Sequence, residues 1–303
     1  MSNHVTHIDA STPLSQLVEH EAFITDNIQG GLLLLPWYGT REDMNEPFEN
    51  IGRYLVFHSH INTPSMLDAV NRLIDDTSAG NQVFYPVYSA EERAQNPELE
   101  HVGLFYFRGN TEAPFAIFNP GGGFSYVGAI HESMPLAHQL SNAGYNAFSL
   151  SYRMESGDKA CEDLAAAITY IFNHADELRV STQGYSLWGG SAGARMASML
   201  GTYGTAAFGY PDTPQAGTVV MAYTGQSSYT PYDPPTYSVV GENDGIASSR
   251  VMTRRIRNLQ SAGVPADIQV FPNLEHGFGL GIGTSAEGWM DDARAFWEEY
   301  GLT

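Results

Sequence analysis

One serine of this chain stands in a setting that suits a nucleophile. Residues 189–193 read Gly-Gly-Ser-Ala-Gly, a G-x-S-x-G pattern with a strand-like run before it and helix formers after it. A serine hydroxyl is a weak nucleophile until a tight strand-to-helix turn exposes it to a base that takes its proton. The flanking glycines leave room for that turn. Because so short a pattern also occurs by chance, its meaning depends on the rest of the chain.

Three consecutive glycines upstream of this serine can supply the amides that such a reaction needs. The apolar run at 114–119 predicts a strand, and the sequence Pro-Gly-Gly-Gly-Phe at 120–124 follows it directly. Backbone N–H groups in such a loop can point at the negatively charged oxygen that forms during acyl transfer. The alternative interpretation is a flexible turn after a strand, which glycine-rich segments usually are. We expect an oxyanion hole with two donors from this loop and a third from the amide of Ala192, the residue after the serine.

A carboxylate and a histidine follow the serine, each after a predicted strand. Residues 236–241 predict one strand and residues 266–271 another, which leads to His276 in a loop. An acid at a strand end can orient the histidine and stabilise its protonated form. We take Asp244 as that acid, although Glu242 can do the same task and Asn-Asp-Gly is also ordinary turn chemistry. A lone loop histidine is more often a solvated surface residue, but here it completes the order of glycine loop, serine, aspartate and histidine.

This order, and the segments that carry it, resemble the α/β-hydrolase esterases. Within them the chain is nearest the acetylxylan-esterase-like and carboxylesterase branch, because Pro120 stands where relatives of hormone-sensitive lipase have histidine. The resemblance implies an α/β-hydrolase fold with Ser191 as nucleophile and Asp244 and His276 as its partners. It also implies an oxyanion hole formed by the amides of Gly122, Gly123 and Ala192, and it does not fix the substrate. We expect no cofactor and no bound metal. The matching segments are 119–124 with Glu132, 144–153 with Asp163, 189–193, 241–244 and 275–278.

Short apolar strands alternate with helical stretches, which indicates a mostly parallel sheet covered by helices on both faces. We expect one α/β-hydrolase domain over 1–303, with an N-terminal extension at 1–100 and a catalytic core at 101–303. The core strands are predicted at 114–119, 146–151, 184–188, 218–222, 236–241 and 266–271, and the helices at 133–142, 158–174, 192–203 and 286–300.

The N-terminal extension has less regular patterns. The position of segment 41–100 before the core favours a partial lid over the site. His58 and His60 would share one face of a strand, a spacing that metals use, but no nearby cysteine or acid completes a site, so a polar patch or packed edge is the simpler interpretation. The patterns predict strands at 55–58 and 82–88, a helix at 64–76 and an antiparallel strand at 102–107.

Acidic residues outnumber basic ones, with 34 Asp and Glu against 14 Lys and Arg and a formal net charge of −20. Such a surface repels nucleic acid and anionic membranes, so we expect neither as a partner. It modestly favours neutral or cationic substrates, although a solvated surface that serves solubility is the simpler meaning. With 43% hydrophobic and 16% charged residues, the composition excludes a disordered chain or a coiled coil.

The cysteine content and the N-terminal sequence bear on the cellular compartment. Cys161 is the only cysteine, so no intrachain disulfide can form, and its helical setting favours a small core residue. Residues 1–10 lack the basic start and apolar stretch of a secretory signal, and the apolar run at 32–35 is far too short to span a bilayer. We expect a cytoplasmic protein, and the sequence leaves a homo-oligomer open.

The predicted function is hydrolysis of a small-molecule ester in two steps through an acyl-serine. An aromatic cleft without a long apolar lid favours short acyl groups such as acetyl, on a sugar or a small alcohol. Two alternatives stay open: a serine peptidase of the prolyl-oligopeptidase type, and a noncatalytic hydrolase-like binding protein. The expected pocket walls, for which simple packing is an equally good explanation, are Phe124, Tyr126, Tyr223 and Tyr229.

Overall fold

A computed structural model describes residues 6–36, 44–154 and 156–303. Its main sheet has eight strands in the order β10-β9-β8-β7-β5-β6-β4-β3. Neighbouring strands from β10 to β6 are parallel, while β4 is antiparallel to both β6 and β3. The mostly parallel sheet is therefore confirmed. The strands are β3 (Phe84–Pro86), β4 (Gly103–Phe107), β5 (Pro114–Asn119), β6 (Asn146–Ser151), β7 (Ser181–Gly190), β8 (Thr218–Ala222), β9 (Thr236–Gly241) and β10 (Ala266–Phe271).

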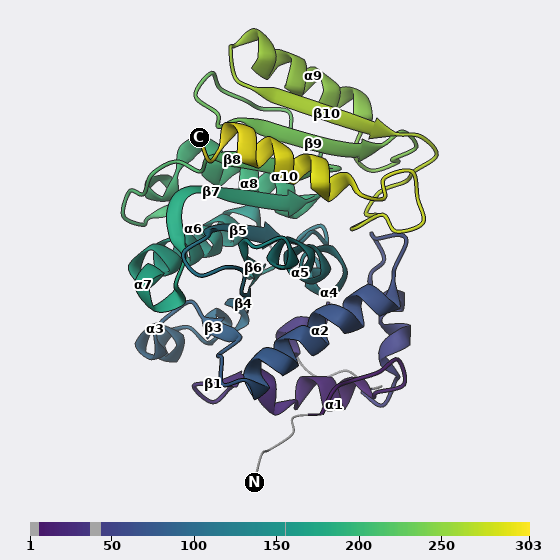
Figure 1. Ribbon diagram of the computed structural model, residues 1–303, viewed down its shortest axis with the longest axis vertical. Helices are drawn as coiled ribbons and strands as arrows, with labels where there is room; N and C mark the ends of the chain where they lie inside the picture. The colour runs from purple at the N-terminus through teal and green to yellow at the C-terminus, as the bar shows by residue number, and fades with distance from the viewer. Residues whose placement is uncertain (1–5, 37–43, 155) are drawn as a thin grey trace.

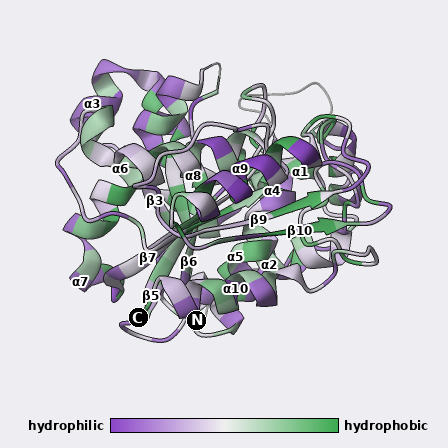
Figure 2. Ribbon diagram, turned by 90° about the horizontal axis from the view of Figure 1, so that it is seen from above, coloured by the Kyte–Doolittle hydropathy of each residue, from purple (hydrophilic) through white to green (hydrophobic). Residues whose placement is uncertain are grey.

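Helices cover both faces of this sheet, as Figures 1 and 2 show from two directions. On one side lie α2 (Thr63–Ser78), α5 (Met134–Asn142) and α10 (Trp289–Tyr300). On the other side lie α6 (Gly157–Asn173), α8 (Ala192–Tyr203) and α9 (Ser249–Ser261). A three-layer arrangement of this kind buries both faces of a parallel sheet, so its inner strands can be apolar without alternation.

The burial pattern of the strands agrees with their place in the sheet. Every residue of β4, β6, β8 and β9 is buried, whereas the edge strand β10 has no buried residue. The continuous apolar runs of the sequence thus correspond to strands covered on both faces. Figure 2 shows the same contrast between apolar strands and the hydrophilic outer surfaces of the helices.

Local sequence signals explain where the long helices begin. The side chain of Asn62 caps α2 by accepting the amide of Ser65, and Ser156 caps α6 by accepting the amide of Lys159. Along α2 the residues at helical spacing are buried, and the helix packs against α5 and β4. These buried residues are Met66, Ala69, Val70, Leu73 and Ile74.

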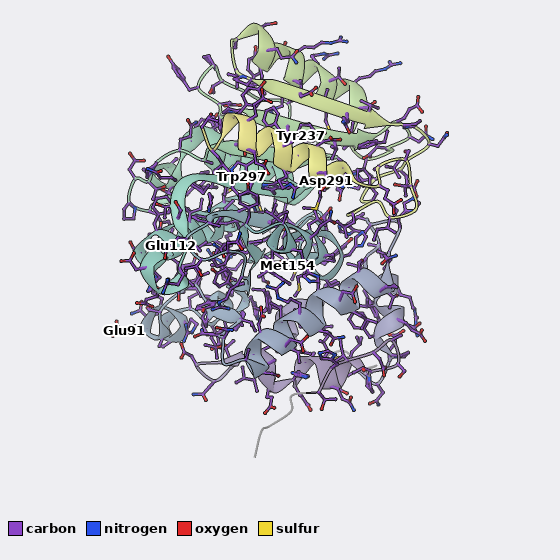
Figure 3. All side chains as sticks on the ribbon, viewed as in Figure 1. Glu91, Glu112, Met154, Tyr237, Asp291 and Trp297 are labelled. Carbon is purple, nitrogen blue, oxygen red and sulfur yellow. The ribbon has the colours of Figure 1, made fainter. Side chains whose placement is uncertain are left out.

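The last helix is fixed to the sheet by two aromatic residues. Trp297 is fully buried and donates its indole N–H to the carbonyl of Gly184 at 2.7 Å. Tyr237 on β9 packs against Phe296 with ring centroids 5.6 Å apart. Figure 3 labels Tyr237 and Trp297 on the side of the sheet that α10 covers. The helix begins at Trp289 rather than at 286, after Gly288 with a φ of +87°.

Most predicted core elements are confirmed, five strands at their predicted bounds. The strand before the serine is longer than predicted, since β7 begins at Ser181. The predicted strand at 82–88 shortens to β3, and the strand predicted at 55–58 is wrong, because a 3₁₀ helix runs to Tyr54 and a turn follows it. Short runs of apolar residues do not by themselves distinguish a strand from a packed turn.

The N-terminal part of the chain lies beside the sheet at the β3 and β4 end (Figure 1). Of the lid predicted at 41–100, the turn at 57–59 reaches the site. Helix α2 packs beside α5, and residues 41–43 lie outside the described residues. No helix in the described ranges is long and apolar enough to cross a membrane. The short helices and strands are α1 (Leu14–Val18), Glu21–Phe23, β1 (Ile24–Thr25), β2 (Ile28–Gln29), Gly30–Leu34, Phe48–Tyr54, α3 (Ala90–Gln95), Pro97–His101, α4 (Ala129–Glu132), α7 (Ala175–Leu178) and Thr205–Phe208.

Candidate active site

Ser191 lies on the sharp turn between β7 and α8. Its backbone has a φ of +53° and a ψ of −117°, a conformation that a serine adopts only where the surroundings impose it. A Cβ on Gly189 would lie 2.2 Å from the carbonyl oxygen of Gly193, and one on Gly193 would lie 1.8 Å from that of Asn119. Both glycines are therefore required by the close approach of backbone to backbone. The turn holds the hydroxyl above the carboxyl end of the sheet.

Three side chains from distant parts of the sequence meet at this turn. His276 Nε2 lies 3.1 Å from Ser191 Oγ, and its Nδ1 lies 2.8 Å from Asp244 Oδ2. Asp244 is fixed in turn, because its Oδ1 accepts the amides of Ile246 at 2.8 Å and Ala247 at 2.6 Å. His276 is only 6% exposed, so a surface histidine is the wrong description of it.

The structure distinguishes the two carboxylates that the sequence left open. Asp244 has a fully buried side chain against His276, while Glu242 is exposed. The different burial of the two carboxylates follows from the backbone at the end of β9. Gly241 passes so close to Leu274 that a Cβ on it would lie 2.0 Å from the Leu274 carbonyl oxygen. The backbone then turns, with the amide of Asp244 donating to the carbonyl of Gly241 at 3.2 Å.

The glycine loop after β5 lies against the serine turn. A Cβ on Gly121 would lie 2.9 Å from Ser191 Cβ, so the two segments are in direct contact. Gly122 and Gly123 have φ values of +139° and +63°, which other residues rarely adopt. In the described part of the chain, the amides of Gly122, Gly123 and Ala192 donate to no acceptor. They remain available for an external acceptor beside the serine.

Glu132 is a buried carboxylate beneath this loop, which the sequence indicated only through the family resemblance. Gly121 donates its amide N–H to Oε2, and His58 Nε2 lies 3.0 Å from the same oxygen. The other carboxylate oxygen, Oε1, is buried and has no hydrogen-bond partner among the described residues. Burial alone would raise the pKa of Glu132, but the His58 imidazole and the Gly121 amide hold the pKa well below its ordinary value. The carboxylate is thus a fixed acceptor for the loop.

Two of the expected pocket walls prove to be supports behind the site. Tyr223 is 1% exposed, with its ring 4.9 Å from that of His276, and its hydroxyl accepts the amide of Gly279 at 3.2 Å. Tyr126 is 7% exposed and its hydroxyl lies 2.6 Å from His58 Nδ1. Burial raises the pKa of both phenols, so they stay protonated. The structure corrects the prediction that Tyr126 and Tyr223 are open pocket walls, because β8 and the glycine loop turn both rings inward.

The other two expected walls are placed differently. Phe124 is half-buried at the end of the glycine loop, with its ring 6.4 Å from that of Tyr152. Tyr229 is 41% exposed, and within the described ranges no hydrogen bond or ring contact joins it to the triad. Sequence reasoning missed Phe57, which is 41% exposed, stacks on Tyr126 with ring centroids 5.8 Å apart, and lies 3.3 Å from a Cβ built on Gly123.

His58 and His60 do not form the pair that their spacing suggested. His58 points inward to Tyr126 and Glu132, whereas His60 has a φ of +53° and contacts Glu275 at 2.7 Å. The two therefore face different partners from a turn instead of sharing a strand face. Across the described ranges, no group of three His, Cys, Asp or Glu side chains is placed to hold a metal ion.

Residues 106–221 match the family model BD-FAE, an esterase-type α/β-hydrolase family. Among curated protein sequences no relative matches the chain.

Several solved structures share the fold at low sequence identity. The chain is similar to an acetyl ester-xyloside bifunctional hydrolase from Caldicellulosiruptor lactoaceticus, with a TM-score of 0.63 and 19% identity over 72% of this chain and 96% of that one. It is similar to the thermophilic esterase Est2 of Thermogutta terrifontis, with a TM-score of 0.57 and 18% identity over 66% of this chain and 88% of that one. It also resembles MGS-M1, an α/β-hydrolase enzyme from a Medee basin deep-sea metagenome library, with a TM-score of 0.57 and 19% identity over 67% and 93% of the two chains. The solved structures show that this chain has the α/β-hydrolase fold, and residues 106–221 within it match an esterase-type family model.

Proposed function

We propose that the protein hydrolyses short-acyl esters of small molecules through a Ser191 acyl-enzyme. The observation that carries the proposal is the connected series of contacts from Asp244 to His276 at 2.8 Å and from His276 to Ser191 at 3.1 Å. It joins a carboxylate, an imidazole and a hydroxyl within hydrogen-bonding range. This is the arrangement in which a histidine removes the proton of a serine as the serine attacks.

The roles of the three side chains follow from their hydrogen bonds. Both oxygens of Asp244 act as acceptors, so Nδ1 of His276 carries the hydrogen and Nε2 is free to accept the hydroxyl proton of Ser191. Ser191 Oγ then forms a bond to the ester carbonyl carbon, and His276 returns the proton to the leaving alcohol. A water molecule, deprotonated by the same imidazole, releases the acid from the serine.

The negative oxygen of each tetrahedral intermediate requires donors that are already in place. We assign this role to the amides of Gly122, Gly123 and Ala192, since they have no acceptor in the described chain and their loop touches the serine turn. Ala192 also begins α8, so the positive end of a helix adds to the attraction. Loss of one donor of this kind costs about 10²- to 10³-fold in rate.

The substrate we propose is an ester of a short acid, such as acetate, with a sugar or a small alcohol. Support comes from the similarity to the acetyl ester-xyloside hydrolase of Caldicellulosiruptor. Phe57, exposed beside Gly123, offers an apolar surface next to the reacting carbonyl. The net charge of −20 favours a neutral substrate over an anionic one.

The test of this function combines covalent labelling with turnover of p-nitrophenyl acetate. A fluorophosphonate should label the wild-type protein at Ser191, and Ser191→Ala should abolish both labelling and turnover while its circular dichroism is unchanged. Ser261→Ala is the matched control, because Ser261 is exposed at the far end of α9. Retained turnover in Ser191→Ala would place the nucleophile elsewhere.

Two other functions give different results in the same experiment. A noncatalytic binding protein would neither be labelled nor hydrolyse esters. A peptidase of the prolyl-oligopeptidase type would be labelled but would act on peptides and leave acetylated xylo-oligosaccharides intact. Activity on a series of acyl chain lengths, falling as the chain grows, supports the short-acyl assignment; a rise with length contradicts it.

A further inference from the structure

The turn formed by Phe57, His58 and Ser59, called the splint below, touches both loops that carry the proposed chemistry. From one side it contacts the glycine loop at 120–128, and from the other it contacts the histidine loop at 272–279. It lies outside residues 106–221, the range of the family match. The splint is therefore a part of this chain that neither the catalytic motifs nor the family match accounts for.

On the side of the glycine loop the splint ends in a buried series of hydrogen bonds. The hydroxyl of Tyr126 accepts the amide of Phe57 at 2.9 Å and lies 2.6 Å from His58 Nδ1. His58 Nε2 in turn lies 3.0 Å from Glu132 Oε2, with both side chains at least 98% buried. The same carboxylate oxygen accepts the amide of Gly121.

These contacts give each atom of the series one role. Because the phenol of Tyr126 already accepts an amide, its own proton can be donated to His58 Nδ1. The hydrogen of the imidazole then lies on Nε2 and is donated to Glu132. Glu132 therefore receives hydrogen bonds from the splint and from the glycine loop at one oxygen, and this ties the two segments together.

On the side of the histidine loop the contacts are to the backbone. Ser59 Oγ donates to the carbonyl of His276 at 2.7 Å, and the amide of Ser59 donates to the carbonyl of Gly277 at 3.0 Å. A Cβ on Gly277 would lie 2.5 Å from the carbonyl oxygen of Phe57 and 2.7 Å from His58 Cα. The backbones of the splint and the histidine loop are thus packed as closely as two backbone segments allow.

We propose that the splint sets the distance between the oxyanion donors and the general base, with His58 acting on the glycine loop through Glu132 and Ser59 acting on the backbone of His276. His58, Ser59 and Glu132 are positioning residues, since they act through groups that meet the substrate. The proposal rests on the proposed function, because it concerns how those catalytic groups are aligned. Misplacement by about 1 Å is enough to cost a large factor in rate.

The experiment compares His58→Leu, which removes both hydrogen bonds, with His58→Gln, which retains a donor toward Glu132. With p-nitrophenyl acetate, His58→Leu should lower kcat about 10- to 100-fold, less than the loss of an oxyanion donor outright, and leave KM within about twofold. His58→Gln should recover most of kcat. Affinity for a trifluoromethyl ketone, whose adduct with serine carries the oxyanion, should fall in parallel with kcat across the variants.

A double-mutant cycle separates alignment from general damage. If His58 acts through Glu132, the loss caused by His58→Leu should be much smaller in a Glu132→Gln background than in the wild type. Additive losses would overturn the proposal. Ser59→Ala, a small change at the second loop, should lower kcat about 3- to 10-fold because it removes one of two hydrogen bonds to that backbone.

Controls keep each outcome decisive. His7→Gln removes an exposed histidine that contacts Asp75, and it should leave kcat and KM unchanged. Should His58→Leu fail to fold, judged by circular dichroism and thermal unfolding, the cycle on His58→Gln and the result with Ser59→Ala carry the test. A wild-type protein without esterase turnover or fluorophosphonate labelling refutes the proposed function; an active wild type with folded His58 and Ser59 variants of equal kcat refutes the splint.

Discussion

Replacing Asp244 by asparagine changes one atom of the triad and leaves its shape intact. The remaining amide oxygen can still accept the N–H groups of Ile246 and Ala247, as Oδ1 does at 2.8 and 2.6 Å. The new NH₂ group then faces His276 Nδ1, where Oδ2 stood at 2.8 Å. Since an amide N–H must meet an acceptor, Nδ1 loses its hydrogen and Nε2 gains one. The imidazole then presents a donor to Ser191 and cannot take its proton.

The expected loss follows from this change of tautomer. In triads of the same design the equivalent change lowers kcat about 10⁴-fold, which corresponds to roughly 5 kcal/mol in the barrier. KM should change little, because Asp244 has a fully buried side chain and does not meet the substrate. We expect thermal unfolding to shift by only a few degrees, since three hydrogen-bond distances are preserved.

The assay is steady-state hydrolysis of p-nitrophenyl acetate with Glu242→Gln as the matched control. Glu242 is exposed and lies two positions from Asp244 on the same turn, so its loss should leave kcat within about twofold. Active-site titration with a fluorophosphonate corrects for any inactive fraction. A kcat for Asp244→Asn above a tenth of the wild-type value, or a larger loss in Glu242→Gln, would refute this assignment.

Three further predictions concern the loop, the buried histidine and the lone thiol. Gly122→Ala would place a Cβ 2.0 Å from the carbonyl oxygen of Tyr126 at a φ of +139°, so kcat should fall at least about 100-fold; an unchanged kcat would locate the oxyanion donors elsewhere. Burial and the neighbouring His58 lower the pKa of His131 from 6.5 to about 4, so between these values the unfolded chain binds a proton that the native protein does not. Stability should therefore fall as pH falls, by about 2 kcal/mol at pH 5, and urea unfolding at pH 7 and 5 should show a smaller loss in His131→Gln. Burial raises the pKa of Cys161 to about 12, so iodoacetamide should label it only in denaturant, and rapid labelling of the native protein would contradict its burial.

The parts of the fold that the sequence predicted well are those in which local pattern and tertiary burial agree. The strands β5, β6, β8, β9 and β10 are short apolar runs bounded by turn residues, and a sheet covered on both faces needs such runs. At 55–58 the same local pattern arises for another reason. Leu55 packs into the core, Val56 is exposed, and Phe57 lies against the glycine loop, so the apolar residues there belong to a turn and no strand.

The residues of the site fall into two groups: those that a sequence motif marks, and those that only the fold brings to the site. Serine, aspartate and histidine stand beside glycines that the backbone needs, and those glycines are visible in the sequence. His58 and Glu132 have no such neighbours, and 74 positions separate them along the chain. Each alone would be costly to bury, because a carboxylate without donors loses its hydration. Their burial is tolerable only as a pair with Tyr126 and the Gly121 amide, and that pairing exists only after the fold brings the N-terminal turn to the end of β5.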